Sequence, residues 1–234
     1  MGGPLLSRAD VARVSITYFS DVLCVWAFIA QLRVDAAKSA FGDQIELDPR
    51  FCSVFGDTRR KIATQWGGKG GYEGFNAHLL HAAEAFPEVR LNPGIWRAVR
   101  PASSTGPHLF LKAAQLAEAR GDVAKGAAEA ATRAMRAAFF EDARDVASWQ
   151  VQRDVGGEAG VDPGAVEARI RDGSAFAALS TDYHDAEVMG IQGSPSFVLN
   201  EGRQKLYGNV GYRIIEANIQ ELIRDPHPDQ ASWC

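Results

Sequence analysis

The chain has 234 residues, of which 46% are hydrophobic and 23% are charged, so it can bury a sizeable core and is not a disordered polyampholyte. With 25 basic and 29 acidic residues its formal net charge is -4, which argues against nucleic acid or an anionic membrane surface as the main partner. No stretch approaches the roughly 18 consecutive apolar residues of a membrane-spanning helix, and the first residues lack the apolar segment of a secretory signal, so we expect a cytoplasmic protein.

A β-α-β unit is predicted at the start of the chain. Apolar residues alternate in the segment 14–19, which is typical of a strand, and recur three or four residues apart in the segment 25–36, which is typical of a helix with one buried face. Gly42 ends this helix, and the segment 45–51 alternates again as a second strand. Such a unit is parallel and right-handed.

A long helical block follows. Between Asp57 and Met189 the sequence is rich in alanine, has helical spacing and contains few runs of β-branched residues, which predicts several helices packed together. Two amphipathic helices are expected, at 107–119 and at 130–140. The face of the first helix that we expect to be buried carries Leu109, Phe110, Ala113, Leu116 and Ala117.

The last part of the chain is predicted to form a hairpin and a helix. The segments 196–199 and 204–207 flank a turn, and the apolar residues of the following segment align on one helix face until Asp225-Pro226 ends it. The order is therefore β-α-β, a helical block, and β-β-α. This order predicts an α/β fold in which the helical block is inserted between two parts of one sheet.

Cys24 stands where the first strand turns into the first helix. At a helix N-terminus the unpaired N–H groups and the helix dipole favour a thiolate, so this position suits a reactive thiol. The alternative is a small apolar residue that fills the core, because free cysteines are usually buried and inert. Position alone leaves both interpretations open.

Three segments carry a resemblance to a known family. They are 20–28, with the sequence SDVLCVWAF, 190–199, with the sequence GIQGSPSFVL, and 139–146, with the sequence FFEDARDV. Together they resemble the thioredoxin-fold family that includes DsbA, FrnE-like oxidoreductases, 2-hydroxychromene-2-carboxylate isomerase and kappa-class glutathione transferase. The resemblance implies a thioredoxin-like core at 12–56 and 190–224, an inserted helical domain at 57–189, and a C-terminal tail at 225–234.

The resemblance also implies a site. In this family the proline of the second motif is cis and faces the active thiol, so Pro195 is expected to be cis and to lie opposite Cys24. Ser194 would then present its backbone to a sulfur-bearing peptide or to glutathione, in the manner of an added strand. Trp26 would form a wall of the pocket. Asn209 is a candidate contact, with a helix-capping role as its alternative.

The chain also departs from the oxidoreductase members of the family. They have Cys-x-x-Cys, whereas this chain has Cys24-Val25-Trp26-Ala27 and lacks the second thiol that would close an internal disulfide. Cys52 would end the neighbouring strand and could resolve a mixed disulfide only with its Cα atom within roughly 7 Å of that of Cys24. Otherwise Cys52 packs under the site or lines it. Cys234, the last residue, is expected to lie on the tail without a role.

Two other motifs are expected to be structural. The spacing of His78, His81 and Glu84 places them on one helix face. Beyond the two histidines no third strong ligand is evident, so no metal site is expected. The glycine-rich segment 67–71 lacks the Lys-Ser/Thr pair of a phosphate-binding loop. We interpret it as a flexible loop that could act as a lid over the thiol edge.

We therefore predict a DsbA-family thiol-disulfide oxidoreductase that works through the single thiolate of Cys24 and forms mixed disulfides with glutathione or a protein thiol. This hypothesis predicts a Cys24 pKa well below about 8.5 and rapid labelling of the thiol. One alternative is a glutathione-dependent isomerase or transferase acting on a small aromatic or electrophilic substrate, with Cys24 in place of the usual serine. A second alternative is a non-catalytic binding protein. The resembled groups are commonly dimeric, so a homodimer is a possible assembly.

Overall fold

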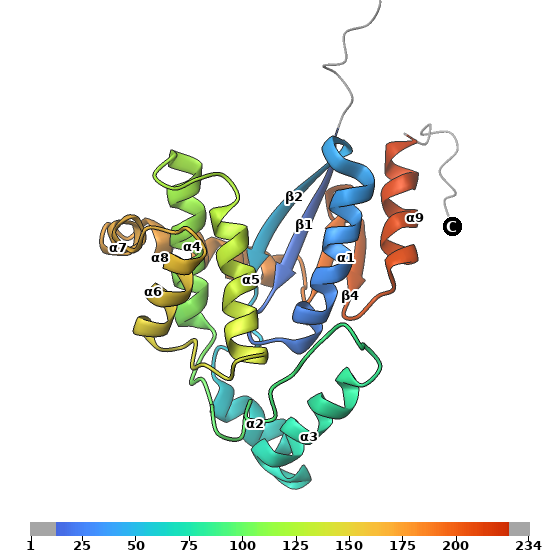
Figure 1. Cartoon of the computed structure of the whole chain (residues 1–234). Coiled ribbons are helices and arrows are strands. Elements are labelled where there is room, and N and C mark those ends of the chain that lie inside the picture. Colours follow the sequence, from blue (N-terminus) through green and yellow to red (C-terminus); the bar gives the residue numbers. More distant parts are fainter. Residues whose placement is uncertain (1–12, 225–234) are drawn as a thin grey trace, which may run out of the picture.

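The structure, a computed structural model, describes residues 13–224 and contains one mixed sheet with the strand order β2-β1-β3-β4 (Figure 1). The strands are β1 (Val14–Ser20), β2 (Ile45–Phe51), β3 (Ser196–Leu199) and β4 (Gln204–Tyr207). β1 pairs with β2 in parallel, β3 pairs antiparallel with β1, and β4 pairs antiparallel with β3. The carboxyl ends of β1 and β2 and the start of β3 therefore meet at one edge of the sheet.

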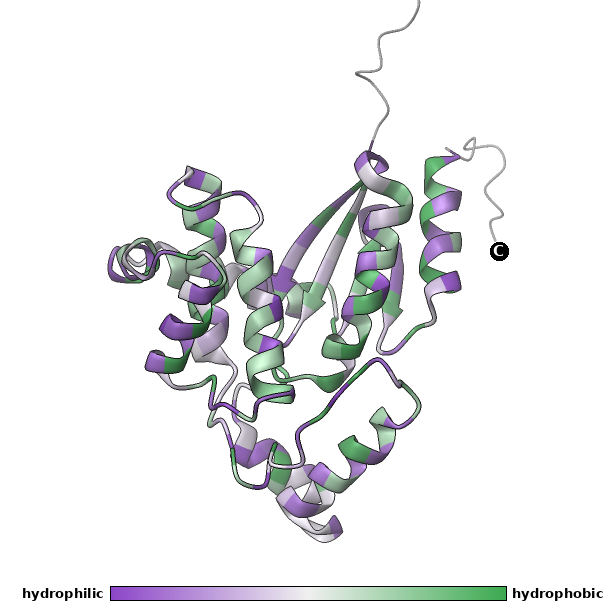
Figure 2. Ribbon diagram, viewed as in Figure 1, coloured by the Kyte–Doolittle hydropathy of each residue, from purple (hydrophilic) through white to green (hydrophobic). Residues whose placement is uncertain are grey.

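Two helices, α1 (Val25–Phe41) and α9 (Tyr212–Ile223), cover one face of the sheet (Figure 1). α1 ends at Gly42, whose φ of 50° is a left-handed value that glycine adopts without strain. Figure 2 shows hydrophilic and hydrophobic residues mixed along α9, as expected for a helix that buries one side and exposes the other. The buried side of α9 supplies Ile215 and Ile219, which pack in one cluster with Ile16 and Tyr18 of β1.

Seven helices of the described chain lie between β2 and β3 in sequence, which confirms the predicted α/β fold with a helical insertion. They are α2 (Thr58–Trp66), α3 (Gly71–Ala83), α4 (Thr105–Arg120), α5 (Ala127–Phe140), α6 (Trp149–Glu158), α7 (Pro163–Arg171) and α8 (Ser174–Val188). α4 packs against α5, α7 and α8, whereas α2 and α3 form a separate pair near the start of α1 (Figure 1). The predicted tail 225–234 and Cys234 lie outside the described residues.

The glycine-rich segment is not the flexible loop that we predicted. Gly67–Lys69 forms a 3-10 turn that follows α2 directly, and α3 begins at Gly71. Gly70 adopts the left-handed conformation with a φ of 88°, which lets the chain reverse between the two helices. A side chain at Gly74 would meet the Lys69 carbonyl oxygen at 1.8 Å. The glycines therefore serve a close turn between two helices.

The buried face of α4 is also wider than we predicted. Leu109 and Leu116 are only partly buried, whereas His108 and Lys112 are buried together with the apolar residues around them. The reason is that α4 has neighbours on several sides, so no simple apolar stripe describes its contacts.

Candidate functional site

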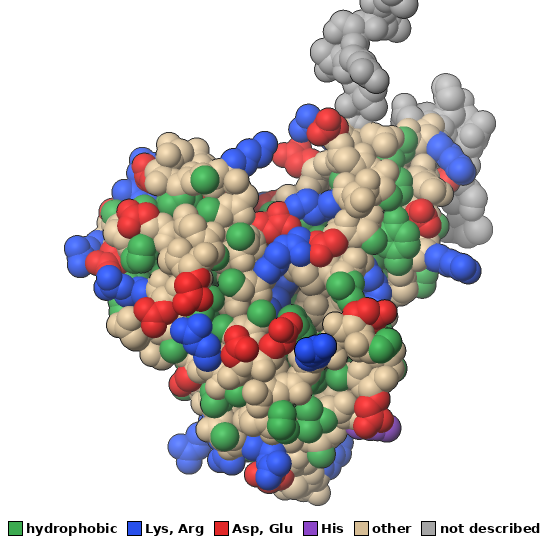
Figure 3. All heavy atoms as spheres, viewed as in Figure 1, with side chains coloured by type: hydrophobic (Ala, Val, Ile, Leu, Met, Phe, Trp, Pro, Cys, Tyr) green, Lys and Arg blue, Asp and Glu red, His purple; other side chains and the backbone are tan. Residues whose placement is uncertain are grey.

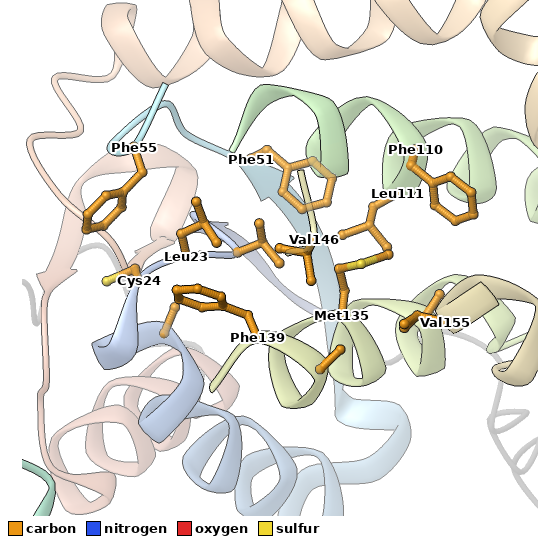
Figure 4. Close-up of a cluster of buried hydrophobic side chains, with 14 of the residues drawn as sticks. Leu23, Cys24, Phe51, Phe55, Phe110, Leu111, Met135, Phe139, Val146 and Val155 are labelled. Carbon is orange, nitrogen blue, oxygen red and sulfur yellow. The ribbon is translucent and has the colours of Figure 1, made fainter. Parts of the chain in front are cut away.

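Cys24 caps the N-terminus of α1, at the sheet edge where β1 ends. Its carbonyl oxygen accepts hydrogen bonds from the N–H groups of Ala27 and Phe28, both at 3.1 Å, and so begins the helix. The residue is 5% exposed and belongs to the large apolar cluster that continues through the helical insertion. Figure 4 shows Cys24 at one margin of this cluster, near Phe55, with Phe110 and Val155 at the other.

The segment before β3 lies directly against this thiol. The Ser194–Pro195 peptide bond is cis, and the Cys24 Sγ donates to the Ser194 carbonyl oxygen at 3.1 Å. The Ser194 hydroxyl accepts from the Asp21 N–H at 2.8 Å, which ties the segment to the end of β1. The structure thus brings Cys24, Ser194 and Pro195 together, although they lie far apart in the sequence.

The electrostatics of Cys24 differ from our expectation. The Ser194 hydroxyl and the N–H groups of Ala27 and Trp26 lower the thiol pKa, as predicted for a helix N-terminus. Burial is the largest effect, however, and with the nearby Asp21 carboxylate it raises the pKa of the Cys24 thiol above its ordinary value. The predicted depression of the pKa is therefore wrong, because the local helix effect is smaller than the loss of solvation.

A buried carboxylate organises the same edge, and sequence reasoning gave it no role. Asp21 is fully buried, and one of its oxygens accepts from the N–H groups of Val54 and Phe55 at 2.9 and 2.7 Å and from the Ser104 hydroxyl at 2.8 Å. Its other oxygen accepts from the Leu23 N–H at 2.9 Å. Asp21 therefore joins the end of β1, the segment after β2 and the start of α4. Its place in the first motif was the only sequence signal.

His108 extends this network as a neutral base. Its Nε2 accepts from the Val22 N–H at 3.0 Å, so the ring proton lies on Nδ1, which is 2.9 Å from the Tyr183 hydroxyl. Burial lowers the pKa of His108 from 6.5 to about 4. The contact of 3.7 Å between His108 Nε2 and Asp21 is therefore not an ion pair at neutral pH. Nothing in its local sequence distinguishes His108 from an exposed helix residue.

Cys52, the second candidate thiol, lies just beyond β2. Its N–H donates to the Ser20 carbonyl oxygen at 3.1 Å, and its side chain packs with Phe19, Ala186 and Val198. Burial raises the pKa of the Cys52 thiol strongly. Cys24 and Cys52 are both free thiols. The surroundings of Cys52 are those of a packed side chain, and its role as a resolving thiol stays a prediction.

Trp26 and Asn209 are connected through Phe86 and Arg33. Trp26 is half-buried and meets Phe86 edge to face, with ring centroids 6.3 Å apart. Arg33 lies over the same Phe86 ring at 5.7 Å and donates to the Asn209 side-chain oxygen. The capping alternative for Asn209 is wrong, because the cap of α9 is Gly211 and the Asn209 side chain bonds to Arg33 instead.

Neither a metal site nor a membrane span is found among residues 13–224. No group of three or more potential metal-binding side chains comes together in that part of the chain. His81 instead pairs with Glu84 at 3.1 Å, and His78 packs against Trp66. Within the same residues, every helix is too short or too polar to cross a membrane.

Comparison with known proteins gives a consistent assignment. The family described as DSBA-like thioredoxin domain matches residues 15–220. A probable DsbA oxidoreductase from Streptomyces coelicolor superposes with a TM-score of 0.72 at 21% identity, over 95% of this chain and 94% of the other. Among curated proteins, no sequence matches this chain.

Two further solved structures share the fold. The cytosolic disulfide reductase DsbM from Pseudomonas aeruginosa, determined with GSH, gives a TM-score of 0.63 at 20% identity and covers 90% of this chain and 99% of its own. A 2-hydroxychromene-2-carboxylate isomerase gives a TM-score of 0.59 at 16% identity and covers 93% of this chain and 100% of its own. Solved structures described as oxidoreductases and as an isomerase thus share the fold of this chain.

Proposed function

We propose that this chain, which belongs to the DSBA-like thioredoxin domain family, is a thiol oxidoreductase that works through a single cysteine, Cys24. The observation that supports this proposal most directly is the contact of 3.1 Å between the Cys24 Sγ and the Ser194 carbonyl oxygen, at the N-terminus of α1. The position three residues later is Ala27, so Cys24 has no neighbouring thiol in its own motif. Among the described residues, Cys52 is the other cysteine, so we take the partner sulfur to come from another molecule or from Cys52.

The proposed reaction has two exchange steps. The Cys24 thiol gives up its proton to water, and its sulfur attacks the glutathione sulfur of a substrate–glutathione disulfide; the new disulfide joins Cys24 to glutathione, and the substrate leaves as a thiolate that takes a proton from water. The thiolate of a second glutathione then attacks this mixed disulfide, releases glutathione disulfide and regenerates Cys24. The substrate ends as a thiol, and its glutathionyl group and one free glutathione end as glutathione disulfide, so sulfur and electrons balance.

The side chains around Phe86 include groups that suit glutathione. The Arg33 guanidinium forms no ion pair with any carboxylate in the described part of the chain, and glutathione carries two carboxylates. Trp26 and Phe86 add aromatic walls next to Arg33. Ser194 would present its backbone to the peptide part of the ligand, as an edge strand does. In this proposal these groups hold glutathione with its sulfur toward Cys24.

The decisive test compares two matched cysteine variants. Native wild-type protein and Cys52→Ser should form a one-to-one mixed disulfide with glutathione when incubated with glutathione disulfide, and mass spectrometry should locate it on Cys24. Cys24→Ser should form none and should lose reduction of a glutathionylated peptide. Adduct formation on Cys52, or retained reduction by Cys24→Ser, would contradict the proposal.

A second function is favoured by one specific observation. Burial holds Cys24 as a protonated thiol that already acts as a hydrogen-bond donor, toward Ser194. A donor at this position could stabilise the thiolate of a bound glutathione, which would then add to a small aromatic or electrophilic substrate, as in a glutathione-dependent isomerase or transferase. In that case Cys24→Ser retains glutathione-dependent turnover, because a hydroxyl also donates. The oxidoreductase loses all turnover with the same substitution.

We assign the cytoplasm as the compartment, because a reducing glutathione pool would resolve the proposed mixed disulfide. Both cysteines among residues 13–224 are free thiols, which is compatible with such a compartment. The homodimer expected from the resemblance stays a prediction, and sedimentation of the full chain would test it.

A further inference from the structure

A cavity lies between α1 and α5, and Cys24 does not line it. It has a volume of about 640 Å³ and is lined by residues of β1, β2, α1, α4 and α5. None of Cys24, Ser194 and Pro195 lines it. Figure 3 shows the corresponding hollow between the lobe that carries α5 and the lobe that carries α1, with Lys, Arg, Asp and Glu side chains around it. Cavities of this volume are typical of sites for small organic molecules.

The floor of this cavity holds a buried cation without a counter-charge. Arg136, on α5, is 1% exposed and lines the cavity. Its two terminal nitrogens donate to neutral acceptors, the Gln31 side-chain oxygen at 2.7 Å and the Ser20 hydroxyl at 2.8 Å. Its Nε has no partner, and no carboxylate of residues 13–224 pairs with it. A buried charge is costly unless it is paired, so this guanidinium lacks an anion.

A second unpartnered donor lies beside it. Tyr18, on β1, is 3% exposed, lines the same cavity, and its hydroxyl makes no hydrogen bond of normal geometry. Burial raises the pKa of Tyr18 to about 12, although the nearby Arg136 guanidinium lowers it, so the hydroxyl keeps its proton. The Arg136 guanidinium and the Tyr18 hydroxyl are therefore neighbours that interact with each other, and among the described residues the Tyr18 proton has no acceptor.

The remaining lining separates into apolar walls and a charged mouth. Val34, Leu47 and Phe51 contribute apolar surface. At the mouth Lys38 pairs with Glu129 at 2.5 Å, which joins α1 to α5 across the opening. Lys38 and Glu129 neutralise each other, and the lining also includes Asp48, Glu118 and Lys125, whereas Arg136 pairs with no carboxylate of the described residues.

We propose that this cavity binds a small monocarboxylate with an apolar body, whose carboxylate accepts hydrogen bonds from the Arg136 Nε and the Tyr18 hydroxyl. A guanidinium is a preferred partner of carboxylates, and a hydrogen bond to a charged group is worth more than one between neutral groups. The apolar body lies against Val34, Leu47 and Phe51. The site is separate from the thiol and independent of the proposed oxidoreductase function.

The ligand class is tested by calorimetric titration of the full-length protein. The probes are benzoate, 2-naphthoate and octanoate, with 2-naphthalenemethanol as the uncharged match of 2-naphthoate. At least one acid should bind with one molecule per chain. The dissociation constant of the alcohol should be at least about ten times that of its acid. Failure of all three acids, or equal binding of the acid and the alcohol, would overturn the proposal.

Two variants test the residues. Tyr18→Phe removes a hydroxyl that has no partner, so the fold is retained, and affinity for the bound acid should fall about tenfold. Arg136→Met should weaken binding by roughly ten- to a hundredfold, with thermal melting as the check of folding. Cys24→Ser should bind the acid as the wild type does, so failure here and failure of the oxidoreductase proposal are distinguishable. Unchanged affinity in Tyr18→Phe would contradict the assignment.

Discussion

Lowering the pH should unfold this protein in a way that depends on His108. Burial lowers the pKa of this imidazole from 6.5 to about 4, so the folded protein holds it neutral where the unfolded chain would protonate it. Protonation would also remove the Nε2 lone pair that accepts from the Val22 N–H. Because the unfolded state binds more protons, the contribution of His108 is fully present above pH 6.5 and is lost as the pH falls toward about 4.

The size of the effect on stability follows from the same lowering of the His108 pKa. A tenfold change in proton affinity corresponds to about 1.4 kcal/mol, so the movement of the pKa implies a loss of about 3 kcal/mol across this pH window. His108 is fully buried, so solvent does not screen the effect. Acidic groups also titrate at low pH, and the total loss of stability therefore has to be compared with that of a variant.

The assay is urea unfolding at several pH values in this window, with His108→Gln as the test variant. The glutamine side-chain oxygen can still accept from the Val22 N–H, but it does not titrate. The wild type should lose about 3 kcal/mol more than His108→Gln between neutral pH and pH 4. His81→Gln, at an exposed position, should behave as the wild type does. Equal losses in the wild type and His108→Gln would refute the reasoning.

Three further predictions concern other buried groups. Alkylation of Cys24 in the native protein should still accelerate with pH above 9.0, because burial raises the pKa of the thiol; a plateau below that value would contradict this. Asp21→Asn should lower the free energy of unfolding in urea by about 1 to 3 kcal/mol, because the amide nitrogen must face a backbone N–H in either orientation; an unchanged midpoint would exclude this role. Lys112 lies 2.6 Å from Asp182, so Lys112→Met should cost about 3 to 5 kcal/mol by the same measurement, since it leaves a buried carboxylate unpaired. A loss below about 1 kcal/mol would show that this pair contributes little.

Much of the site could be expected from local pattern and from the motifs together. The strands β2, β3 and β4 have the predicted bounds, because turn residues mark where these segments begin and end. The resemblance then placed Ser194 and Pro195 against Cys24, where the structure also has them. Local pattern could not show that His108 and Asp21 belong to the buried network beside Cys24, because an isolated histidine on a helix carries no periodic signal.

The sequence by itself determined the order of strands and helices, the position of Cys24 at a helix start and the absence of a second thiol in its motif, since each depends on neighbouring residues. Only the tertiary structure decided the chemical state of that thiol and the charge balance of the cavity that Arg136 lines. Both depend on how much water the surrounding segments exclude, and those segments come from distant parts of the chain. Burial outweighs the helix N-terminus at Cys24, and it leaves Arg136 without a carboxylate among the residues that the structure describes.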